Sequence, residues 1–325
     1  MTKKHIRILS INGGGIRGYI PALIIDELSK QSGQDITQLF DMVIGTSIGG
    51  MLSAAYTTPM DLHNHALGPK YNTSEVLNLM LRSRNEIFPQ DSIRNQLVTA
   101  KYPREGLDNF LTNEFTINGQ PALLKDTMLP IAVTALNEKN NDPQIWSSCS
   151  KFFSNYSLAD AVGATTAAPT YFAPKEVKVH TNLPSSECAN YGMIQKLDGC
   201  YYRLIDGGLF ANSPAMLALQ MIRNRISGKT IEECDAQYSM FQNPSVPWKD
   251  FDLKVDFVNH SFALPNLSLN NETYLTIIEI GTGKFNTKPL LPDLSKINNL
   301  LDGRNSCYWL CWLWHYCSWF ILPYR

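Results

Sequence analysis

The stretch that decides the predicted fold is INGGGIRG, residues Ile11–Gly18. It follows a strand-like segment, Ile6–Ser10, and precedes a helix-like segment that begins at Tyr19. Glycines at such a turn leave the backbone amides open to a bound group, because no side chain blocks the approach. We therefore expect this turn to hold a bound or developing negative charge.

The segments on either side of this turn alternate between strand and helix patterns. Such alternation is typical of βαβ units, in which helices cover a mostly parallel sheet. Continuous apolar runs indicate buried strands, and apolar residues at helical spacing indicate helices. The predicted strands are 6–11, 40–44, 131–136, 202–205 and 275–280. The predicted helices are 19–30, 48–56 and 213–226, and the region 59–125 is predicted to form a helical cap or flank.

Composition and charge narrow the class of protein. The chain has 325 residues, of which 44% are hydrophobic and 18% are charged, as in an ordinary globular protein. Its 28 Lys and Arg balance 29 Asp and Glu, which leaves a net charge of -1. A basic surface is the electrostatic signature of nucleic-acid-binding proteins, so we expect no nucleic-acid partner.

The cysteines and the N-terminus predict a cytoplasmic protein without a metal centre. The seven cysteines are an odd number and lack the spacing of zinc ligands, so we expect reduced thiols. The first residues, Met1–Lys4, pass directly into a strand-like run rather than into the roughly 7 to 15 apolar residues of a signal peptide. Secretion as an effector, without a cleavable signal, stays open as an alternative.

Residues 306–325, at the C-terminus, differ in kind from the rest of the chain. They hold four of the six tryptophans and three of the seven cysteines. Their apolar run, Cys307–Leu322, is shorter than the ~20 residues of a membrane-spanning helix, and His315 and Ser318 interrupt it. Two interpretations stay open: an interfacial anchor, because Trp and Tyr favour the headgroup region, or a packed or non-native end.

Residues 13–18, GGGIRG, also match the G-x-G-x-x-G pattern of dinucleotide-binding proteins. That class needs an acidic residue at the end of the second strand, roughly 20 residues on, to bind the ribose. Asp35 precedes the second predicted strand and Asp41 lies at its start, so neither occupies the ribose position. A dinucleotide-binding enzyme therefore ranks last among the hypotheses, and we expect no cofactor.

The second predicted strand ends instead in GTSIGG, residues 45–50. G-x-S-x-G between a strand and a helix is the nucleophile elbow, in which the glycines permit a tight turn that exposes the serine hydroxyl. Gly45, Ser47 and Gly49 fit this pattern. A serine between glycines is more often a plain turn, but the apolar segments before and after this one favour the elbow.

The two turns together indicate ester chemistry. Adjacent parallel strands end at the same edge of a sheet, which would bring the amides of Gly13, Gly14 and Gly15 beside Ser47. Attack of a serine on an ester carbonyl builds negative charge on oxygen, and backbone amides stabilise that charge. Arg17 either supports the loop or binds an anionic head group, with an ordinary surface arginine as the alternative.

A serine nucleophile needs a base, and the best candidate is Asp206 in YRLIDGG, residues 202–208. It ends an apolar strand, and Gly207 and Gly208 leave room around it. Asp-Gly is also a common turn pair, but the strand before Asp206 and the capped helix after it set this one apart. None of the histidines follows a strand in a recognisable motif; they are His5, His63, His65, His180, His260 and His315.

Four stretches together resemble the patatin-like phospholipase family. They are SINGGGIRGYIP (10–21), GTSIGG (45–50), AAPTYF (167–172) and DGGLFANSP (206–214), and they occur in the family's order. The resemblance covers about residues 5–285. It implies an α/β fold with three α/β/α layers and a mostly parallel central sheet, related to the catalytic domain of cytosolic phospholipase A2.

The resemblance also implies a lipid acyl hydrolase with a Ser-Asp dyad that needs no cofactor or metal. Calcium dependence is not expected, because the chain has no D-x-[DN]-x-[DN]-G loop. Carried over by position, Ser47 is the nucleophile and Asp206 is the proton acceptor. The other implied site residues are Gly13, Gly14, Gly15, Arg17 and Gly18 in the oxyanion loop, Gly45 and Gly49 in the elbow, and Gly207 and Gly208 in the Asp-Gly-Gly motif.

The chain departs from the family pattern at two places. The family commonly has Asp at the start of the glycine loop, where this chain has Asn12; because Asn also hydrogen-bonds turns, we expect activity to survive. The residues after about Asn305 resemble nothing in the family. The predicted domains are a catalytic domain over 5–285 and an extension over 286–325, whose tail 306–325 has no predicted role.

Two alternatives stand beside the acyl hydrolase. A Ser-His-Asp carboxylesterase of the α/β-hydrolase type would share the elbow and use His260, and a catalytically silent lipid-binding protein would keep the fold. The expected partner is a phospholipid or another acyl lipid, reached by peripheral membrane contact through the region 61–115 or the tail. Neither the head group nor the oligomeric state is predicted.

Overall fold

The computed structural model describes residues 4–88, 100–180, 185–226, 267–270 and 273–283. The chain divides into two compact units, Met1–Thr282 and Gly283–Arg325, and every element below belongs to the first. The predicted extension and its Trp-rich tail lie outside the described residues. The predicted domain boundary therefore stays a prediction.

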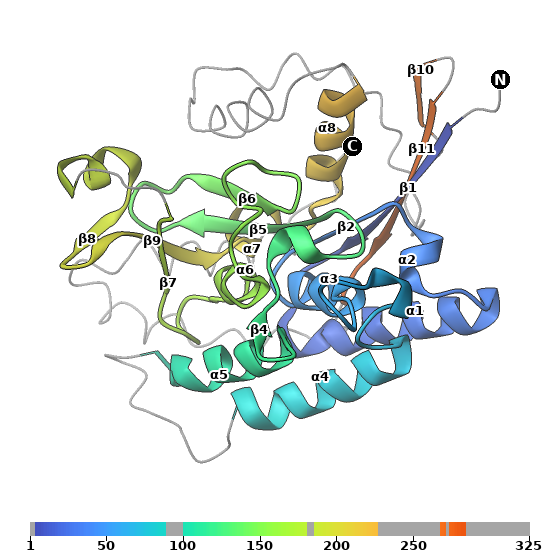
Figure 1. Ribbon diagram of the computed structural model, residues 1–325, viewed down its shortest axis with the longest axis horizontal. Helices are drawn as coiled ribbons and strands as arrows, with labels where there is room; N and C mark the ends of the chain where they lie inside the picture. The colour runs from blue at the N-terminus through green and yellow to red at the C-terminus, as the bar shows by residue number, and fades with distance from the viewer. Residues whose placement is uncertain (1–3, 89–99, 181–184, 227–266, 271–272, 284–325) are drawn as a thin grey trace, which may run out of the picture. The chain divides into compact units, whose positions relative to one another are not determined.

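A mixed sheet forms the middle of the first unit (Figure 1). In the described part of the chain it has nine strands: β1 (Lys4–Ile11), β2 (Met42–Gly45), β5 (Ile131–Asn137), β6 (Pro143–Ser147), β7 (Lys175–Lys178), β8 (Ile194–Lys196), β9 (Gly199–Asp206), β10 (Leu267–Asn270) and β11 (Thr273–Ile280). The strand order is β10-β11-β1-β2-β5-β9-β7, with β6 also paired to β5 and β8 to β9. Strands β11, β1, β2 and β5 run parallel, whereas β10, β6, β9, β7 and β8 join by antiparallel pairing.

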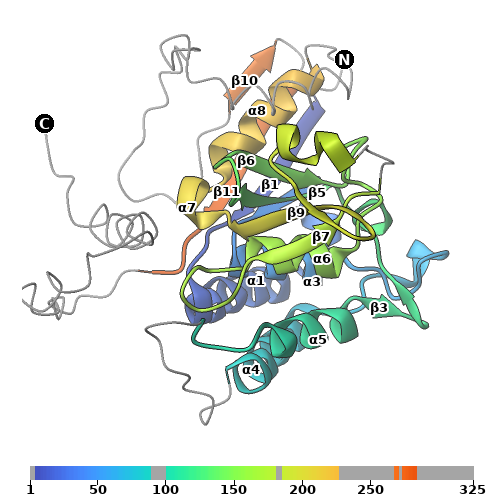
Figure 2. The ribbon, with the colours of Figure 1, turned by 90° about the vertical axis from the view of Figure 1, so that its left-hand side faces the viewer.

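Helices cover both faces of this sheet, as Figure 2 shows. Their bounds are α1 (Tyr19–Ser32), α2 (Ile36–Leu39), α3 (Ile48–Thr57), α4 (Thr73–Ile87), α5 (Arg104–Glu114), α6 (Leu158–Thr165), α7 (Gly208–Ala211) and α8 (Ala215–Ile226), with short 3-10 turns η1 (Gly15–Gly18), η2 (His65–Leu67), η3 (Leu124–Asp126) and η4 (Ser185–Tyr191). Helix α8 lies on one face, and α1, α3 and α6 lie on the other, with α4 and α5 packed outside them. The predicted three-layer α/β/α fold with a parallel centre is confirmed.

The parallel strands are buried on both faces, which is why their sequences are continuously apolar. Leu9, Ile11 and Val43 pack in the core shared with α1 and α3. Ile8 and Ile44, their neighbours along the strands, pack in the core shared with α8. Alternate side chains of a strand point to opposite faces, so each of these strands contributes to both cores.

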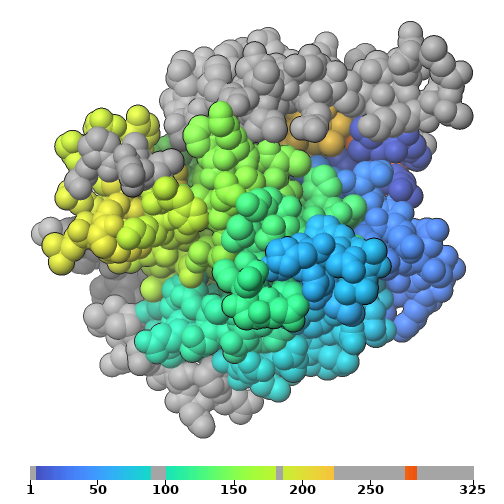
Figure 3. All heavy atoms as spheres, in the orientation of Figure 1, coloured from blue at the N-terminus to red at the C-terminus, as the bar shows by residue number. Residues whose placement is uncertain are grey.

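The long predicted elements agree with the structure, with ends that differ by at most three residues. The region 59–125 is only partly helical: besides α4 and α5 it contains an irregular loop and a hairpin, β3 (Thr116–Ile117) and β4 (Gln120–Pro121). The loop and the hairpin lie next to each other on the surface in Figure 3. The side-chain amide of Asn118 donates to Asp61 Oδ2 at 3.4 Å. No helix in the described ranges combines the length and the apolar character needed to cross a bilayer.

The expectation of reduced thiols is wrong for one pair. Cys188 in η4 and Cys200 in β9 form a disulfide with Cα atoms 5.7 Å apart, and both are buried beside Met193. The pairing is not predictable from spacing, because the two cysteines follow no motif and meet where η4 packs against β9. Structural disulfides persist in oxidising compartments and are rare in the cytosol.

Removal of this disulfide should destabilise the protein. For a loop of this length, replacing both residues (C188A with C200A) is expected to lower the free energy of unfolding by about 3 kcal/mol, measured by urea denaturation. The matched control is C149A, because Cys149 is an exposed free thiol. Complete alkylation of Cys188 and Cys200 in native protein without a reductant would show that the bond does not form.

Candidate active site

Ser47 lies between β2 and α3 in a strained backbone conformation. Its φ of 55° and ψ of -125° are unusual for a residue with a side chain. A Cβ atom on Gly45 would lie 2.2 Å from the carbonyl oxygen of Gly49, and one on Gly49 would lie 2.1 Å from that of Ile11. Both flanking glycines are therefore required by close backbone packing, as in a nucleophile elbow.

Asp206 is the last residue of β9 and its carboxylate contacts the Ser47 hydroxyl. Ser47 Oγ donates to Asp206 Oδ2 at 2.6 Å, and the Gly208 amide donates to Asp206 Oδ1 at 2.7 Å. The backbone amide of Asp206 donates in turn to the carbonyl of Ala167, in the AAPTYF stretch, at 3.0 Å. Three of the four family-like stretches thus meet at Asp206.

The Asp206 carboxyl is almost fully enclosed, with 7% of the residue exposed. Burial disfavours its charged form and raises the pKa of Asp206 to about 6, although hydrogen bonds from Ser47 and the Gly208 amide act in the opposite direction. Such a carboxylate is still mostly ionised at neutral pH, yet it is a stronger base than an exposed aspartate.

The two residues meet because two strands approach from opposite directions beside β5. Strand β2 runs parallel to β5, with Gly45 opposite Val133, whereas β9 runs antiparallel to β5, with Asp206 opposite Ala135. Their ends therefore face each other. The rule for parallel strands predicts the meeting of β1 and β2, but not the antiparallel direction of β9.

The glycine loop lies directly beside Ser47. A Cβ atom on Gly13 would lie 3.3 Å from Ser47 Cβ, and the Gly13 amide is already used, because it donates to the carbonyl of Asn212 at 3.0 Å. Among the described residues, the amides of Gly14 and Gly15 have no hydrogen-bond acceptor. Gly15 has a φ of 57°, a conformation that favours glycine. Two backbone donors thus remain available at this turn.

The other residues of the loop have supporting contacts. The Arg17 side chain donates from Nε to the carbonyl of Gly14 at 3.3 Å, which holds the arginine against the loop. A Cβ atom on Gly18 would lie 2.3 Å from the Ile48 side chain, so the turn from η1 into α1 packs tightly on α3. The side-chain amide of Asn12 donates to Glu279 Oε1 at 2.7 Å rather than to the turn that Asn12 begins.

Three buried threonines, which sequence reasoning missed, hold the elbow in place. Thr165 in α6 accepts a hydrogen bond from the Ser47 amide at 2.8 Å. The Thr46 hydroxyl lies 2.8 Å from that of Thr134 and donates to the carbonyl of Ala211 at 2.7 Å. No sequence signal distinguishes these threonines, because their role follows from contacts between distant elements.

No histidine of the described chain hydrogen-bonds Ser47 or Asp206. His5 contacts Thr276 and His180 stacks on Tyr156, whereas His63 belongs to the loop after α3. His260, the base of the carboxylesterase alternative, lies outside the described residues, as does His315. The described residues also contain no group of three or more His, Cys, Asp or Glu side chains arranged to hold a metal ion.

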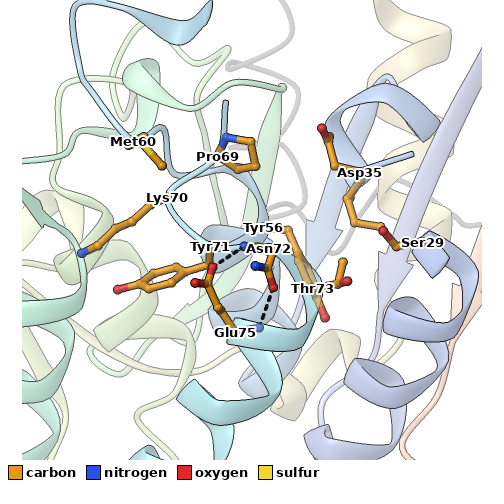
Figure 4. A pocket seen from close by; sticks show the side chains of 11 residues that line it. Ser29, Asp35, Tyr56, Met60, Pro69, Lys70, Tyr71, Asn72, Thr73 and Glu75 are labelled. Carbon is orange, nitrogen blue, oxygen red and sulfur yellow. Dashed lines mark hydrogen bonds between the residues drawn. The ribbon is translucent and has the colours of Figure 1, made fainter. Parts of the chain in front are cut away.

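A cavity of about 380 Å³ lies at the other end of α3 (Figure 4). Tyr56 lines it, near the C-terminal end of the helix whose N-terminal end carries Ser47. Asp35, the acid weighed for a ribose, also lines it but caps α2 by accepting hydrogen bonds from two backbone amides. Neither Ser47 nor Asp206 belongs to the lining, so this cavity is separate from the Ser-Asp pair.

Replacement of the buried carboxyl should stabilise the protein most at alkaline pH. The folded-state pKa of Asp206, about 6, exceeds its usual value of 3.8. The contribution of this carboxyl to the free energy of unfolding is therefore complete below about pH 3.8 and is lost as pH rises through about 6. Because this shift corresponds to about 3 kcal/mol, D206N should resist urea better than the wild type near pH 8, and the difference should shrink near pH 4. S47A keeps the carboxyl and is the control. Identical pH profiles of stability for D206N and the wild type would contradict the shift.

Comparisons with known proteins identify the family of this chain. The Patatin-like phospholipase family model matches residues 9–219. The chain is 34% identical to Patatin-like protein 2 of Arabidopsis thaliana over 69% of this chain and 54% of that protein. It is 29% identical to Patatin-like protein 2 of Oryza sativa subsp. indica over 71% and 56%, and 28% identical to Patatin group J-1 of Solanum tuberosum over 67% and 54%.

The crystal structure of VipD from Legionella pneumophila has a TM-score of 0.30 and 14% identity, over 64% of this chain and 46% of that one. The chain spans about half the length of the curated relatives that it matches. Since the family model covers well over half of the 325 residues, including the elbow and Asp206, this chain belongs to the patatin-like phospholipase family.

Proposed function

We propose that this chain is a lipid acyl hydrolase of the phospholipase A type, which cleaves fatty acyl esters of phospholipids or related lipids. The observation that carries the proposal is the 2.6 Å hydrogen bond from Ser47 Oγ to the buried carboxylate of Asp206. A hydroxyl becomes a useful nucleophile when a base accepts its proton within hydrogen-bond reach. The pair supplies a nucleophile and a base without a metal or a cofactor.

The reaction begins when Ser47 Oγ attacks the acyl carbon and Asp206 accepts its proton. Negative charge then develops on the former carbonyl oxygen. Its proposed donors are the Gly14 and Gly15 amides, because they have no acceptor among the described residues. Collapse of this intermediate breaks the ester bond, and protonated Asp206 returns its proton to the leaving alcohol. Water, activated by the same carboxylate, then releases the fatty acid from Ser47.

The position of Ser47 at the N-terminal end of α3 adds to this stabilisation. Unpaired amides at the start of a helix carry partial positive charge, which favours an alkoxide or an oxyanion nearby. Arg17 donates to the Gly14 carbonyl and so fixes the orientation of the peptide group that carries the Gly15 amide. The proposed oxyanion loop is therefore Gly13–Gly18, with Gly14 and Gly15 as its donors.

The two alternatives make different demands on the same site. A Ser-His-Asp carboxylesterase needs a histidine between Ser47 and Asp206, whereas these two are in direct contact. A silent lipid-binding protein has no need for a strained serine that points at a buried base. Both observations favour the dyad, and labelling of H260A with a fluorophosphonate probe separates it from the triad: retained labelling supports the dyad.

The dyad is tested by hydrolysis of mixed phospholipid vesicles without calcium. We expect fatty-acid release by the wild type and a loss of at least about a thousand-fold in S47A and D206A, because removal of a nucleophile or its base abolishes the main catalytic route. The wild-type kcat/KM should rise with pH and level off above about 6, since only ionised Asp206 accepts the proton. Equal release by all three proteins would place the chemistry elsewhere.

We also propose peripheral membrane contact through an apolar stripe that begins at the glycine loop. Its members, spaced as one face of a helix, are Ile16, Ile20, Leu23 and Ile24, which are 55%, 40%, 44% and 38% exposed. The opposite face of α1 is apolar too, with Ala22 and Ile25 buried in the core. The first turns of α1 are therefore apolar on all sides and lie beside the proposed lipid-cleaving site, so they are suited to contact with a lipid surface. The contacts predicted from the sequence are instead the region 61–115 and the tail, and the tail lies outside the described residues.

Three serines in the stripe should weaken vesicle hydrolysis selectively. For I20S/L23S/I24S we expect a loss of about tenfold or more on phosphatidylcholine vesicles, because less apolar surface leaves water, and a change within about twofold on a soluble p-nitrophenyl ester. L197S is the control, since Leu197 is exposed near the far end of β9 from Asp206. Equal losses on both substrates would contradict membrane contact through this stripe.

A further inference from the structure

One carboxylate outside the Ser-Asp pair joins the two loops of the site. Glu279 lies near the end of β11, next to Ser10 of β1 in the parallel ladder. Its Oε1 atom accepts a hydrogen bond from Asn12 Nδ2 at 2.7 Å and another from Ser213 Oγ at 2.6 Å. Asn12 begins the glycine loop, and Ser213 lies between α7 and α8. Glu279 thus bridges the loop after β1 and the loop after β9.

Backbone hydrogen bonds join the same segments. The backbone amide of Asn12 donates to the carbonyl of Ile280, and the backbone amide of Gly13 donates to the carbonyl of Asn212, both at 3.0 Å. The Thr282 hydroxyl donates to the carbonyl of Gly13 at 3.0 Å. These bonds set the backbone of the loop, but any side chain at position 12 permits them. The side-chain bridge through Glu279 is the part that depends on which residue occupies each position.

Glu279 is matched to its partners by hydrogen-bonding chemistry. An ionised carboxylate only accepts, and both of its partners, a side-chain amide and a hydroxyl, can donate. The other polar atom of the Asn12 side chain, Oδ1, is buried and has no partner among the described residues, so the side chain is held through its donor. A carboxylate at position 12 would place two acceptors, and two negative charges, at this hydrogen-bonding distance.

We propose that Glu279 is a positioning residue for acyl-ester hydrolysis. Through Asn12 it holds the glycine loop, with the Gly14 and Gly15 amides, at the correct distance from Ser47. Through Ser213 it holds the same loop in line with the segment that follows Asp206. This role rests on the proposed function, because its effect is on the alignment of oxyanion donors with the nucleophile.

The bridge is tested by exchanging its donor and its acceptor. N12D places a carboxylate at position 12 against the carboxylate of Glu279. E279Q instead leaves an amide oxygen at position 279, which still accepts hydrogen bonds from Asn12 and Ser213. In N12D/E279Q the donor and acceptor change places: the new side-chain amide at position 279 donates to the new carboxylate at position 12, while its oxygen accepts from Ser213. Each variant is measured on a soluble p-nitrophenyl ester at about pH 8, where a shared proton between carboxylates is least available.

We expect N12D to lower kcat by between about tenfold and a hundredfold with KM within about twofold, the cost of misplaced donors rather than of lost substrate binding. E279Q should lose about threefold or less, and N12D/E279Q should recover to the level of E279Q. The matched control is N140D, because Asn140 also donates to a carboxylate, Asp142, but on an exposed loop. Thermal unfolding of each variant distinguishes loss of alignment from loss of folded protein.

An N12D enzyme with wild-type kcat, or a double variant as slow as N12D, overturns the positioning role while the dyad stands. A loss in N12D that equals its loss of folded protein also overturns it. A wild type that hydrolyses no ester overturns the proposed function, and the positioning role with it. A loss of kcat in N12D at an unchanged fraction of folded protein, with recovery in the double variant, is the result that a purely structural role does not produce.

Discussion

The structure depends on a meeting of two strand ends beside β5. Strand β2 delivers Ser47 from one direction and β9 delivers Asp206 from the other, so a hydroxyl and a carboxylate face each other inside the protein. Burial without partners is costly for a carboxylate. The Ser47 hydroxyl and the Gly208 amide offset part of that cost, and burial still raises the pKa of Asp206. The same enclosure that weakens the fold makes the carboxylate a better base.

Several features of the site cost free energy of folding, and the surrounding core stabilises them. Ser47 occupies a strained conformation, Gly45 and Gly49 allow backbones to approach where no side chain fits, and the Asp206 carboxyl is buried. Such features persist only when contacts from several neighbouring elements hold them in place. Here the buried threonines and the parallel strands, with their two apolar cores, supply those contacts.

Local signals carried most of the prediction. The glycine turn, the elbow and Asp206 each lie at a strand end that apolar runs reveal, which is why these elements are predictable to within a few residues. Contacts between distant segments are not predictable in this way. The antiparallel direction of β9, the Cys188–Cys200 pair and the bridge from Glu279 to Asn12 depend on how elements far apart in sequence are brought together. A charged residue near the end of an apolar strand, as at Glu279, is the one signal that could have pointed to the bridge.

Helix α3 has no exposed face: every residue from Ile48 to Thr57 is buried. Most substitutions in such a helix alter the packing of the core, so its sequence has little freedom to drift. Substitutions are better tolerated in the loops and outer helices around Ser47. The segment that carries Ser47 can therefore stay unchanged while the surface around it changes.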